Sequence, residues 1–320
     1  MEAQLSFEAG QASHQGRRAT NQDSVASYIP SQAVRIVKGA LFVVADGTGP
    51  GGAWASRQGA QALLYEYFHD PSLALEESLR RAIARVNYRL HTQISRAPSY
   101  RETSSTAVLA ALRGHGLYVA HVGDSRAYLF RGGQAHQLTV DHSWAAEAVA
   151  RKLIKPQDAR YHPWRHVLTR SLGPRPQVLA DVARYRLRPG DVVLLCTDGL
   201  SDVVLPQEML RFRSLANPQQ IAWALVNLAV RRGTDDNVTA LVICVGQPPR
   251  GVLLYPTPQP VAFKAARARP APQQGVAWQA HAASGLGTGM AVAIGAASGL
   301  AAALILTMVM FLLLIAVLSR

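Results

Sequence analysis

Acidic residues at the ends of apolar, strand-like runs constrain the fold of this chain more than any other feature of its sequence. The runs VVLLCTDG and FVVADG both end in Asp-Gly, at Asp198 and Asp46, while Asp124 separates two further runs and Asp236 precedes another. An Asp-Gly pair after a strand can be simple turn chemistry. If the strands share one core, however, their ends bring several carboxylates to one place.

Clustered carboxylates raise one another's pKa unless a cation lies among them. Oxygen ligands suit Mg²⁺ or Mn²⁺, whereas zinc prefers nitrogen and sulfur. The two cysteines, Cys196 and Cys244, lie inside apolar runs without the spacing of metal ligands, so we interpret them as core residues in a reducing compartment. The pattern therefore predicts a site for a hard divalent cation.

Residues 1–246 have the pattern of a mixed α and β domain. Strands and hairpins are predicted within 34–46, 105–134 and 179–199. These strand groups alternate with pairs of helices rather than with single crossover helices. This order favours antiparallel sheets covered by helices over a Rossmann sheet.

Two helices are predicted from apolar residues that recur every three or four positions. The first stripe consists of Leu75, Leu79, Ile83, Val86, Leu90 and Ile94, and the second of Ile221, Leu225 and Leu228. The second helix has Asn217 as its cap and Pro218 at its first position, which is a typical helix start. Both stripes are expected to face the core.

Charge is unevenly distributed along the chain, whose formal net charge is +13. No basic run with interleaved aromatic residues occurs, so the sequence disfavours nucleic-acid binding. From Gly246 onward there are five basic residues and no acidic one. Any carboxylate site therefore lies N-terminal to Gly246.

The C-terminal part predicts a linker followed by a membrane anchor. Residues 247–284 are rich in proline and basic, and residues 285–318 carry no charged residue, which exceeds the ~20 residues needed to span a bilayer. Basic residues precede this span, and the N-terminus lacks a signal-peptide pattern. We therefore expect a single-pass membrane protein with residues 1–246 in the cytoplasm. Two Gly-x-x-x-Gly spacings, at Gly285 and Gly295, leave a dimer through this helix as an open alternative.

A series of short motifs carries a family resemblance. In order along the chain they are RATNQDS, VVADGTG, STAVLAAL, HVGDSRAYL, LTVDHSW, HVLTRSLG, LLCTDGLSD and GTDDNVTALVI. With this order and spacing, residues 5 to 246 resemble the metal-dependent protein phosphatase 2C family of bacterial type. The resemblance implies an α+β fold, in which a β-sandwich of two antiparallel sheets is flanked by helices on both sides. It also implies that residues 1–246 form the catalytic domain.

The resemblance implies metal ligands among the acids at the strand ends. Asp46 would bridge two metal ions, with the carbonyl group of Gly47 as a further ligand. Asp198 and Asp236 would hold one ion from the other side, and Asp23 would act on the inner shell through water. The implied cofactors are two Mn²⁺ or Mg²⁺ ions.

Two further residues complete the implied site. Asp124 matches the position linked to a third, weaker metal ion in bacterial members, and Arg18 would bind the substrate phosphate. Two adjacent metal ions lower the pKa of a bridging water, and the resulting hydroxide attacks phosphorus in line. Arg18 then offsets charge on the phosphoryl oxygens. The implied activity is a serine/threonine phosphoprotein phosphatase that opposes protein kinases, with phosphorylated proteins as partners.

The sequence departs from the family pattern at two positions. Gln22 stands where many members have Glu, which removes one carboxylate, and Thr48 stands where animal relatives carry a His proposed as general acid. His142 and His162 are alternative proton donors, but both occur in loop-like sequence, and we interpret them as structural.

A second hypothesis is a catalytically weak pseudophosphatase that serves as a membrane-anchored scaffold for phosphoproteins. Each Asp-Gly could then be a turn, and Arg18 a surface charge. The full set of Asp23, Asp46, Asp198 and Asp236 favours the enzyme, because a binding module has no need of all four carboxylates.

Overall fold

The structure is a computed structural model that describes residues 5–215 and 217–246. The chain divides into two compact units, Met1–Ala262 and Phe263–Arg320, and every described residue lies in the first. The predicted linker and membrane segment, residues 247–318, lie outside the described residues. Within the described ranges, no helix is both long and apolar enough to cross a membrane.

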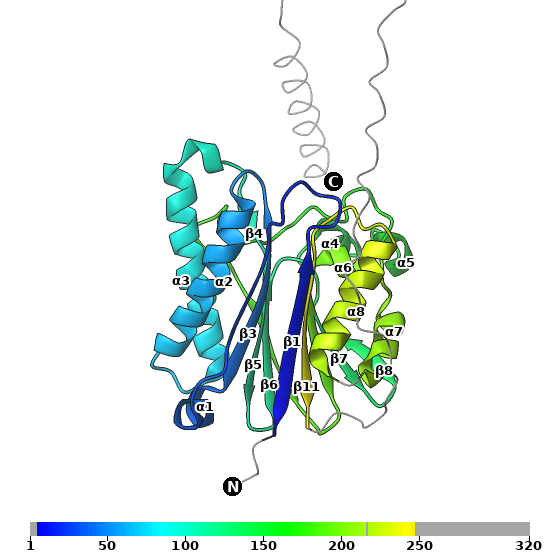
Figure 1. The fold of residues 1–320 in the computed structure, drawn as a ribbon. Helices are drawn as coiled ribbons and strands as arrows, with labels where there is room; N and C mark the ends of the chain where they lie inside the picture. Colours follow the sequence, from blue (N-terminus) through cyan, green and yellow to red (C-terminus); the bar gives the residue numbers. More distant parts are fainter. Residues whose placement is uncertain (1–4, 216, 247–320) are drawn as a thin grey trace, which may run out of the picture. The chain divides into compact units, whose positions relative to one another are not determined.

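Two antiparallel sheets form the centre of the domain, as the sequence predicts (Figure 1). The first sheet has the order β1 (Phe7–His14), β11 (Val238–Val245), β10 (Val192–Cys196), β7 (Arg126–Arg131) and β8 (Gln134–Gln137). The second has the order β2 (Asp23–Tyr28), β3 (Ala40–Thr48), β5 (Ala107–Arg113), β6 (Gly116–Val122) and β9 (Asp181–Arg186), with β4 (Ser104–Ser105) paired to β3.

The central strands are buried on both faces. Along β3, Phe42 and Val44 belong to the core between the two sheets, while Leu41 and Val43 belong to the core beneath the helices. The strands β5, β10 and β11 are likewise buried along their lengths. Two-sided burial explains why these strands have continuous apolar sequences rather than alternating ones.

Helices cover the outer face of each sheet (Figure 1). On the second sheet lie α2 (Gly52–His69) and α3 (Leu75–Arg96), whose predicted apolar stripe is buried throughout. On the first sheet, α8 (Pro218–Arg231) packs against β1 and β11. The side chain of Asn217 accepts a hydrogen bond from the N–H of Gln220, which confirms the predicted cap.

Shorter helical turns complete the domain. They are α1 (Gln32–Lys38), η1 (Pro98–Tyr100), α4 (Trp144–Ala150), α5 (Pro156–Ala159), α6 (Asp198–Ser201), α7 (Pro206–Met209) and η2 (Leu210–Ser214).

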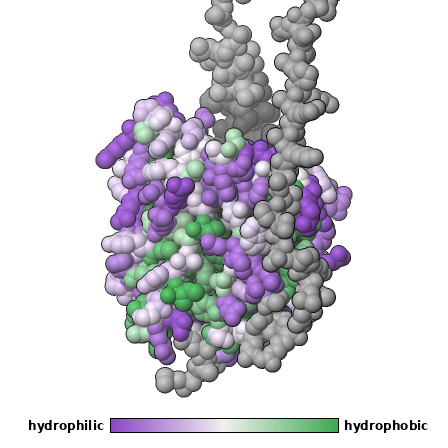
Figure 2. Space-filling model, viewed as in Figure 1, coloured by the Kyte–Doolittle hydropathy of each residue, from purple (hydrophilic) through white to green (hydrophobic). Residues whose placement is uncertain are grey.

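The helix α1 corrects one prediction, since its sequence was expected to begin a strand. Val34, Ile36 and Val37 are 42%, 60% and 42% exposed, so this apolar run does not enter the core. Gly39, at φ 75°, separates the helix from β3 because other residues rarely adopt that conformation. Figure 2 shows apolar residues gathered at the lower left of this face, where Figure 1 draws α1.

Candidate active site

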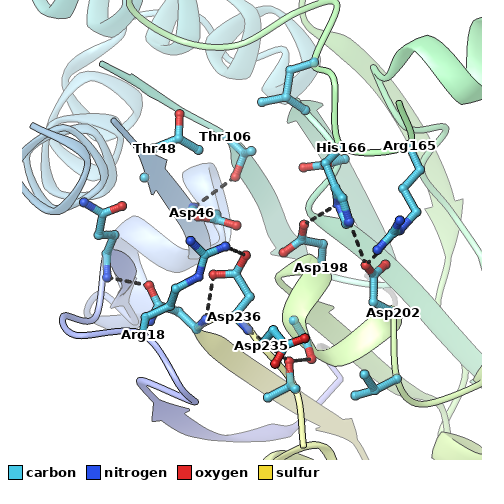
Figure 3. Close-up of a pocket in the computed structure, with 18 of the residues that line it drawn as sticks. Arg18, Asp46, Thr48, Thr106, Arg165, His166, Asp198, Asp202, Asp235 and Asp236 are labelled. Carbon is cyan, nitrogen blue, oxygen red and sulfur yellow. Dashed lines mark hydrogen bonds and ion pairs between the residues drawn. The ribbon is translucent and has the colours of Figure 1, made fainter. Parts of the chain in front are cut away.

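A pocket of about 720 Å³ opens where strand ends from both sheets meet. Its lining includes Arg18, Asp46, Asp124, Asp198 and Asp236, five of the residues singled out in the sequence. Figure 3 shows Asp46, Asp198 and Asp236 around the same hollow. We call Asp23, Asp46, Asp124, Asp198 and Asp236 the acid cluster.

Asp23 lies behind Asp46, because β2 and β3 pair these two residues directly. Oδ2 of Asp23 accepts hydrogen bonds from the hydroxyls of Thr197, at 2.9 Å, and Thr239, at 2.7 Å. Its other oxygen, Oδ1, is buried and has no hydrogen-bond partner. Thr239 of β11 and Thr197, which directly follows β10, thus hold an acid of the second sheet and join the two sheets beneath the pocket.

The two Asp-Gly glycines are required by close backbone approach. A Cβ atom on Gly199 would lie 1.9 Å from the carbonyl oxygen of Asn237, and one on Gly47 would lie 2.0 Å from that of Gly52. Both distances are far inside van der Waals contact, so only glycine fits. The Asp-Gly pairs therefore serve to bring separate segments against the acids and are more than turns.

Asn237 fixes the segment that carries Asp236. Its side-chain oxygen accepts a hydrogen bond from the N–H of Gln22, and its amide nitrogen donates to the carbonyls of Gln15 and Thr20, at 2.9 Å each. The guanidinium group of Arg18 donates to Oδ2 of Asp236 at 2.8 Å (Figure 3). Arg18 thus reaches the pocket, where it is paired with an acid of the cluster.

Asp198 lies at the start of α6 and faces His166. Nδ1 of His166 is 3.3 Å from Oδ2 of Asp198, and Nε2 is 3.5 Å from Oδ2 of Asp202, which also lies 3.8 Å from Nε of Arg165 (Figure 3). Oδ1 of Asp198 is buried without a hydrogen-bond partner. Carboxylate and imidazole atoms of Asp124, His166 and Asp198 lie within 4.8 Å of one another.

Burial is the main cause of raised pKa values in the cluster. The pKa of Asp46 lies well above its ordinary value because of burial and then repulsion from the other four acids. Burial and repulsion from Asp198 also raise the pKa of Asp124. Burial raises the pKa of Asp23 to about 7, although its two hydroxyl hydrogen bonds lower it in part. Without a cation, these carboxylates therefore tend to hold protons.

Asp198 differs from its neighbours. Burial raises its pKa, but the hydrogen bond and charge of His166, together with a hydrogen bond from Asp46 and the charge of Arg126, lower the pKa of Asp198 below its ordinary value. The same contact raises the pKa of His166. His166, when protonated, thus offsets part of the negative charge of Asp198.

The donor set fits divalent cations. The cluster offers carboxylate oxygens from four strand ends and one turn, and two buried oxygens, Oδ1 of Asp23 and Oδ1 of Asp198, have no hydrogen-bond partner. Oxygen donors of this kind bind Mg²⁺ or Mn²⁺. A cation bound among these carboxylates would offset the repulsion that contributes to the raised pKa values.

Sequence reasoning missed several residues of the pocket. Arg160, Arg165, His166 and Asp202 line it, yet none was singled out. The motif HVLTRSLG contains His166 and was the available signal, but nothing in its sequence indicates that the segment 145–166 covers the acids.

Two of the four other residues considered in the sequence lie at the pocket, and the two histidines do not. Gln22 and Thr48 line the pocket, where the Gln22 amide donates to the carbonyl of Gly49 and the Thr48 hydroxyl contacts that of Ser104. His142 and His162 do not belong to the pocket lining. His142 is buried, and His162 stacks on Trp144 with ring centroids 4.5 Å apart.

Comparison with known sequences gives consistent similarities. A family model described as Protein phosphatase 2C matches residues 10–238. The serine/threonine protein phosphatase PstP of Mycobacterium tuberculosis is 32% identical over 227 residues, which cover 70% of this chain and 42% of PstP. The protein phosphatase PhpP of Streptococcus pneumoniae is 30% identical over 255 residues, which cover 77% of this chain and 98% of PhpP. The chain thus spans less than half the length of PstP and nearly all of PhpP.

Comparison with solved structures agrees. The crystal structure of the PstP catalytic domain in complex with two manganese ions matches with a TM-score of 0.65 and 30% identity. The match covers 76% of this chain and all of that domain.

Proposed function

This chain belongs to the protein phosphatase 2C family, and on that premise we propose that it is a metal-dependent protein-serine/threonine phosphatase. It hydrolyses phosphate monoesters on phosphorylated proteins and opposes Ser/Thr protein kinases. Relatives named as serine/threonine phosphatases, including PstP, support this proposal.

The observation that carries the proposal is a partly buried acid cluster that lacks enough positive charge of its own. Asp46 has no cationic side chain bonded to it among the described residues, although four other acids repel it. A fold that concentrates negative charge in this way is stable with all carboxylates ionised only when cations bind. A binding scaffold has no need of such an arrangement, so the enzyme is favoured over the pseudophosphatase.

The acids at the strand ends divide the metal-binding roles. Asp46 and the Gly47 carbonyl would hold two ions of Mn²⁺ or Mg²⁺, with Asp198 and Asp236 as further ligands and Asp23 acting through water. When bound, the ions activate water for attack on phosphorus and offset negative charge on the phosphoryl oxygens.

Arg18, a positively charged residue of the pocket, binds the substrate phosphate. The guanidinium group of Arg18, which lies 2.8 Å from Oδ2 of Asp236, would be free to donate two parallel hydrogen bonds to phosphoryl oxygens if Asp236 held a cation instead. Asp124, within 4.8 Å of His166 and Asp198, contributes to a third and weaker ion.

Hydrolysis of a phosphothreonine peptide by the purified full-length protein tests the proposal. We expect turnover with Mn²⁺, none in EDTA, and recovery when Mn²⁺ is restored. Unchanged turnover in EDTA would exclude the metal-dependent mechanism, and no turnover with Mn²⁺ on any phosphopeptide would favour the scaffold.

Membrane anchoring is a separate proposal that rests on sequence alone. Residues 285–318 lack charge, and basic residues precede them, so we propose a single-pass anchor that keeps the phosphatase domain in the cytoplasm. Full-length protein should sediment with membranes and resist carbonate extraction, and a truncation ending at Gln274 should remain in the supernatant. Full-length protein in the soluble fraction would contradict the anchor.

A further inference from the structure

A second cluster, built on two buried histidines, lies beside the acid cluster and takes no part in lining the pocket. It consists of His121, His142, Asp181 and Arg170. The rings of His121 and His142 stack with centroids 4.4 Å apart, and Nε2 of His121 contacts the carbonyl of Val140 at 2.8 Å. Two buried, stacked histidines beside a partly exposed, ion-paired acid require an explanation that the pocket does not provide.

Hydrogen bonding fixes the tautomer of His142. The N–H of Gly123 donates to Nδ1 at 3.1 Å, so Nδ1 is the acceptor nitrogen and the ring proton lies on Nε2. Nε2, which carries the ring proton, lies 3.2 Å from Oδ2 of Asp181. Arg170 in turn donates to Oδ1 of Asp181 at 2.6 Å.

The same tautomer disfavours a metal ion in this second cluster. A metal at Nε2 would need the lone pair there and would move the ring proton to Nδ1. That proton would then face the N–H of Gly123. Burial, followed by the nearby His121 and Arg170, lowers the pKa of His142 to about 4, which agrees with a neutral ring at physiological pH.

His142 binds both polar backbone groups of Gly123. Besides the bond to Nδ1, the N–H of His142 donates to the carbonyl of Gly123 at 3.0 Å. Gly123 has φ 103°, and a Cβ atom there would lie 2.6 Å from the side chain of Thr106. The turn is thus tightly defined, and the next residue is Asp124.

His142 also begins the segment that covers the pocket. Its carbonyl accepts from the N–H of Thr169 at 2.9 Å, and the N–H of Trp144 donates to the carbonyl of Val167 at 2.8 Å. Residues 142–144 and 167–169 therefore close the base of the segment 145–166, which brings Arg160, Arg165 and His166 to the pocket. One buried histidine joins this base to the Asp124 turn.

We propose that His142 is a positioning residue, which holds the Gly123 turn and the base of segment 145–166 so that Asp124 faces Asp198 and His166. The proposal rests on the assignment of Asp124 to the third, weaker ion in the proposed function. It predicts that loss of His142 affects that ion selectively, because the contacts of His142 are with Gly123, His121, Asp181 and Thr169 and with none of the other proposed ligands.

Mn²⁺ binding to the purified full-length protein tests the proposal, with free Mn²⁺ followed by its electron paramagnetic resonance signal. We expect two tight ions and a weaker third ion in the wild type. His142→Phe, which keeps the ring stack but offers no nitrogen to Gly123, should weaken the third ion at least about tenfold and leave the two tight ions unchanged. His142→Asn, which retains an acceptor near the position of Nδ1, should restore much of that binding.

Two further variants make the test specific. His121→Phe keeps the stack and does not touch Gly123, so it should bind the third ion as the wild type does. In an Asp124→Asn background, His142→Phe should cause no additional loss, because the two changes act through one ligand. If His142→Phe fails to fold, Asp181→Asn replaces it, with a smaller but selective loss expected.

The contradictory outcomes separate the two proposals. Three ions in the wild type with an unaltered third ion in His142→Phe, or equal weakening of all three ions, would overturn the positioning role alone. Only two ions in the wild type would overturn the assignment of Asp124 and the positioning role with it. An ion that is lost in both His121→Phe and His142→Phe but kept in Asp124→Asn would make the second cluster itself a metal site, against the proposal.

Discussion

Two groups of buried acids in this domain differ in what neutralises them. Glu66 and Asp70, at the α2–α3 interface, are 4% and 2% exposed, and Arg85 lies 3.4 Å from the former and 3.5 Å from the latter. Arg89 approaches Glu66 at 2.6 Å, and Arg81 lies 3.9 Å from Asp70. This group carries its positive charge within the fold.

The acid cluster has the opposite arrangement. Its five carboxylates have Arg18 on Asp236 and His166 on Asp198, and no cationic side chain bonded to Asp23 or Asp46 among the described residues. Buried ions are tolerated only when they are paired. The comparison teaches that a group of acids in which every member is paired with arginine belongs to the fold, whereas a group with members such as Asp23 and Asp46, which have no cationic partner among the described residues, marks a site for an exchangeable cation.

The largest expected effect comes from Asp46→Asn. Loss of a shared metal ligand should lower turnover by about 10³-fold, which corresponds to several kcal/mol of transition-state stabilisation. In EDTA the variant should unfold at the same or a higher temperature than the wild type, because a repelled carboxylate has been removed. Phosphopeptide kinetics and thermal unfolding measure the two effects. A variant with lower thermal stability but wild-type turnover would mean that Asp46 stabilises the fold and does not bind a catalytic metal ion.

The opposite result is expected for Glu66→Gln. Arg89 and Arg85 lose their charged partner in a buried setting, so the free energy of unfolding should fall by about 2 kcal/mol, with the partial exposure of both arginines limiting the loss. Turnover per folded molecule should not change. Denaturant unfolding measures the first quantity and active-site-normalised kinetics the second. A tenfold loss of turnover at wild-type stability would mean that this group also serves the active site.

The pH dependence of stability should differ between metal-free wild type and Asp23→Asn. Because the pKa of Asp23 is raised from 3.8 to about 7, the folded state holds a proton that the unfolded state has lost, so this group contributes stability that falls as pH rises from about 4 to about 7. His142, whose pKa is lowered to about 4, acts in the opposite direction, but it is common to both proteins and cancels in their difference. In EDTA, the stability of the wild type relative to the variant should therefore decline over this range. A constant difference would contradict the raised pKa.

The smallest effect is expected at Asp235, a neighbour of Asp236 with a different environment. Asp235 is paired with Arg17 at 2.9 Å, and its side chain is 85% exposed, so Asp235→Asn should change turnover less than about twofold. The matched variant Asp236→Asn should lower turnover and raise the Mn²⁺ concentration needed for half activation. Equal losses in both variants would indicate a general charge effect rather than a ligand.

Some of this arrangement was predictable from sequence and some was not. Two-sided burial makes β3 and β10 apolar along their length, so an acid at the end of each is conspicuous, and the α3 stripe repeats at helical spacing. By contrast, the run 34–37 resembles a strand but forms α1 on the surface, where no core contact selects for a strand. An apolar run in the sequence therefore does not by itself show whether its residues are buried in the folded protein.

The partners of the acids were the least predictable part. His166 reaches Asp198 through the segment 145–166, which has two short helices and no strand in it. Likewise, Thr197 and Thr239 hold Asp23 across more than 170 residues of sequence. Such contacts depend on how distant segments pack, which residue spacing does not record.

Calorimetric titration of the purified full-length protein with Mn²⁺ at pH 7 tests most directly whether the acid cluster is a cation site. The account predicts at least two bound ions in the wild type, release of protons on binding because Asp23 and Asp46 have raised pKa values, and unchanged binding in Glu66→Gln. Binding should be lost or strongly weakened in Asp46→Asn. Absence of Mn²⁺ binding in the wild type, or wild-type binding in Asp46→Asn, would contradict it.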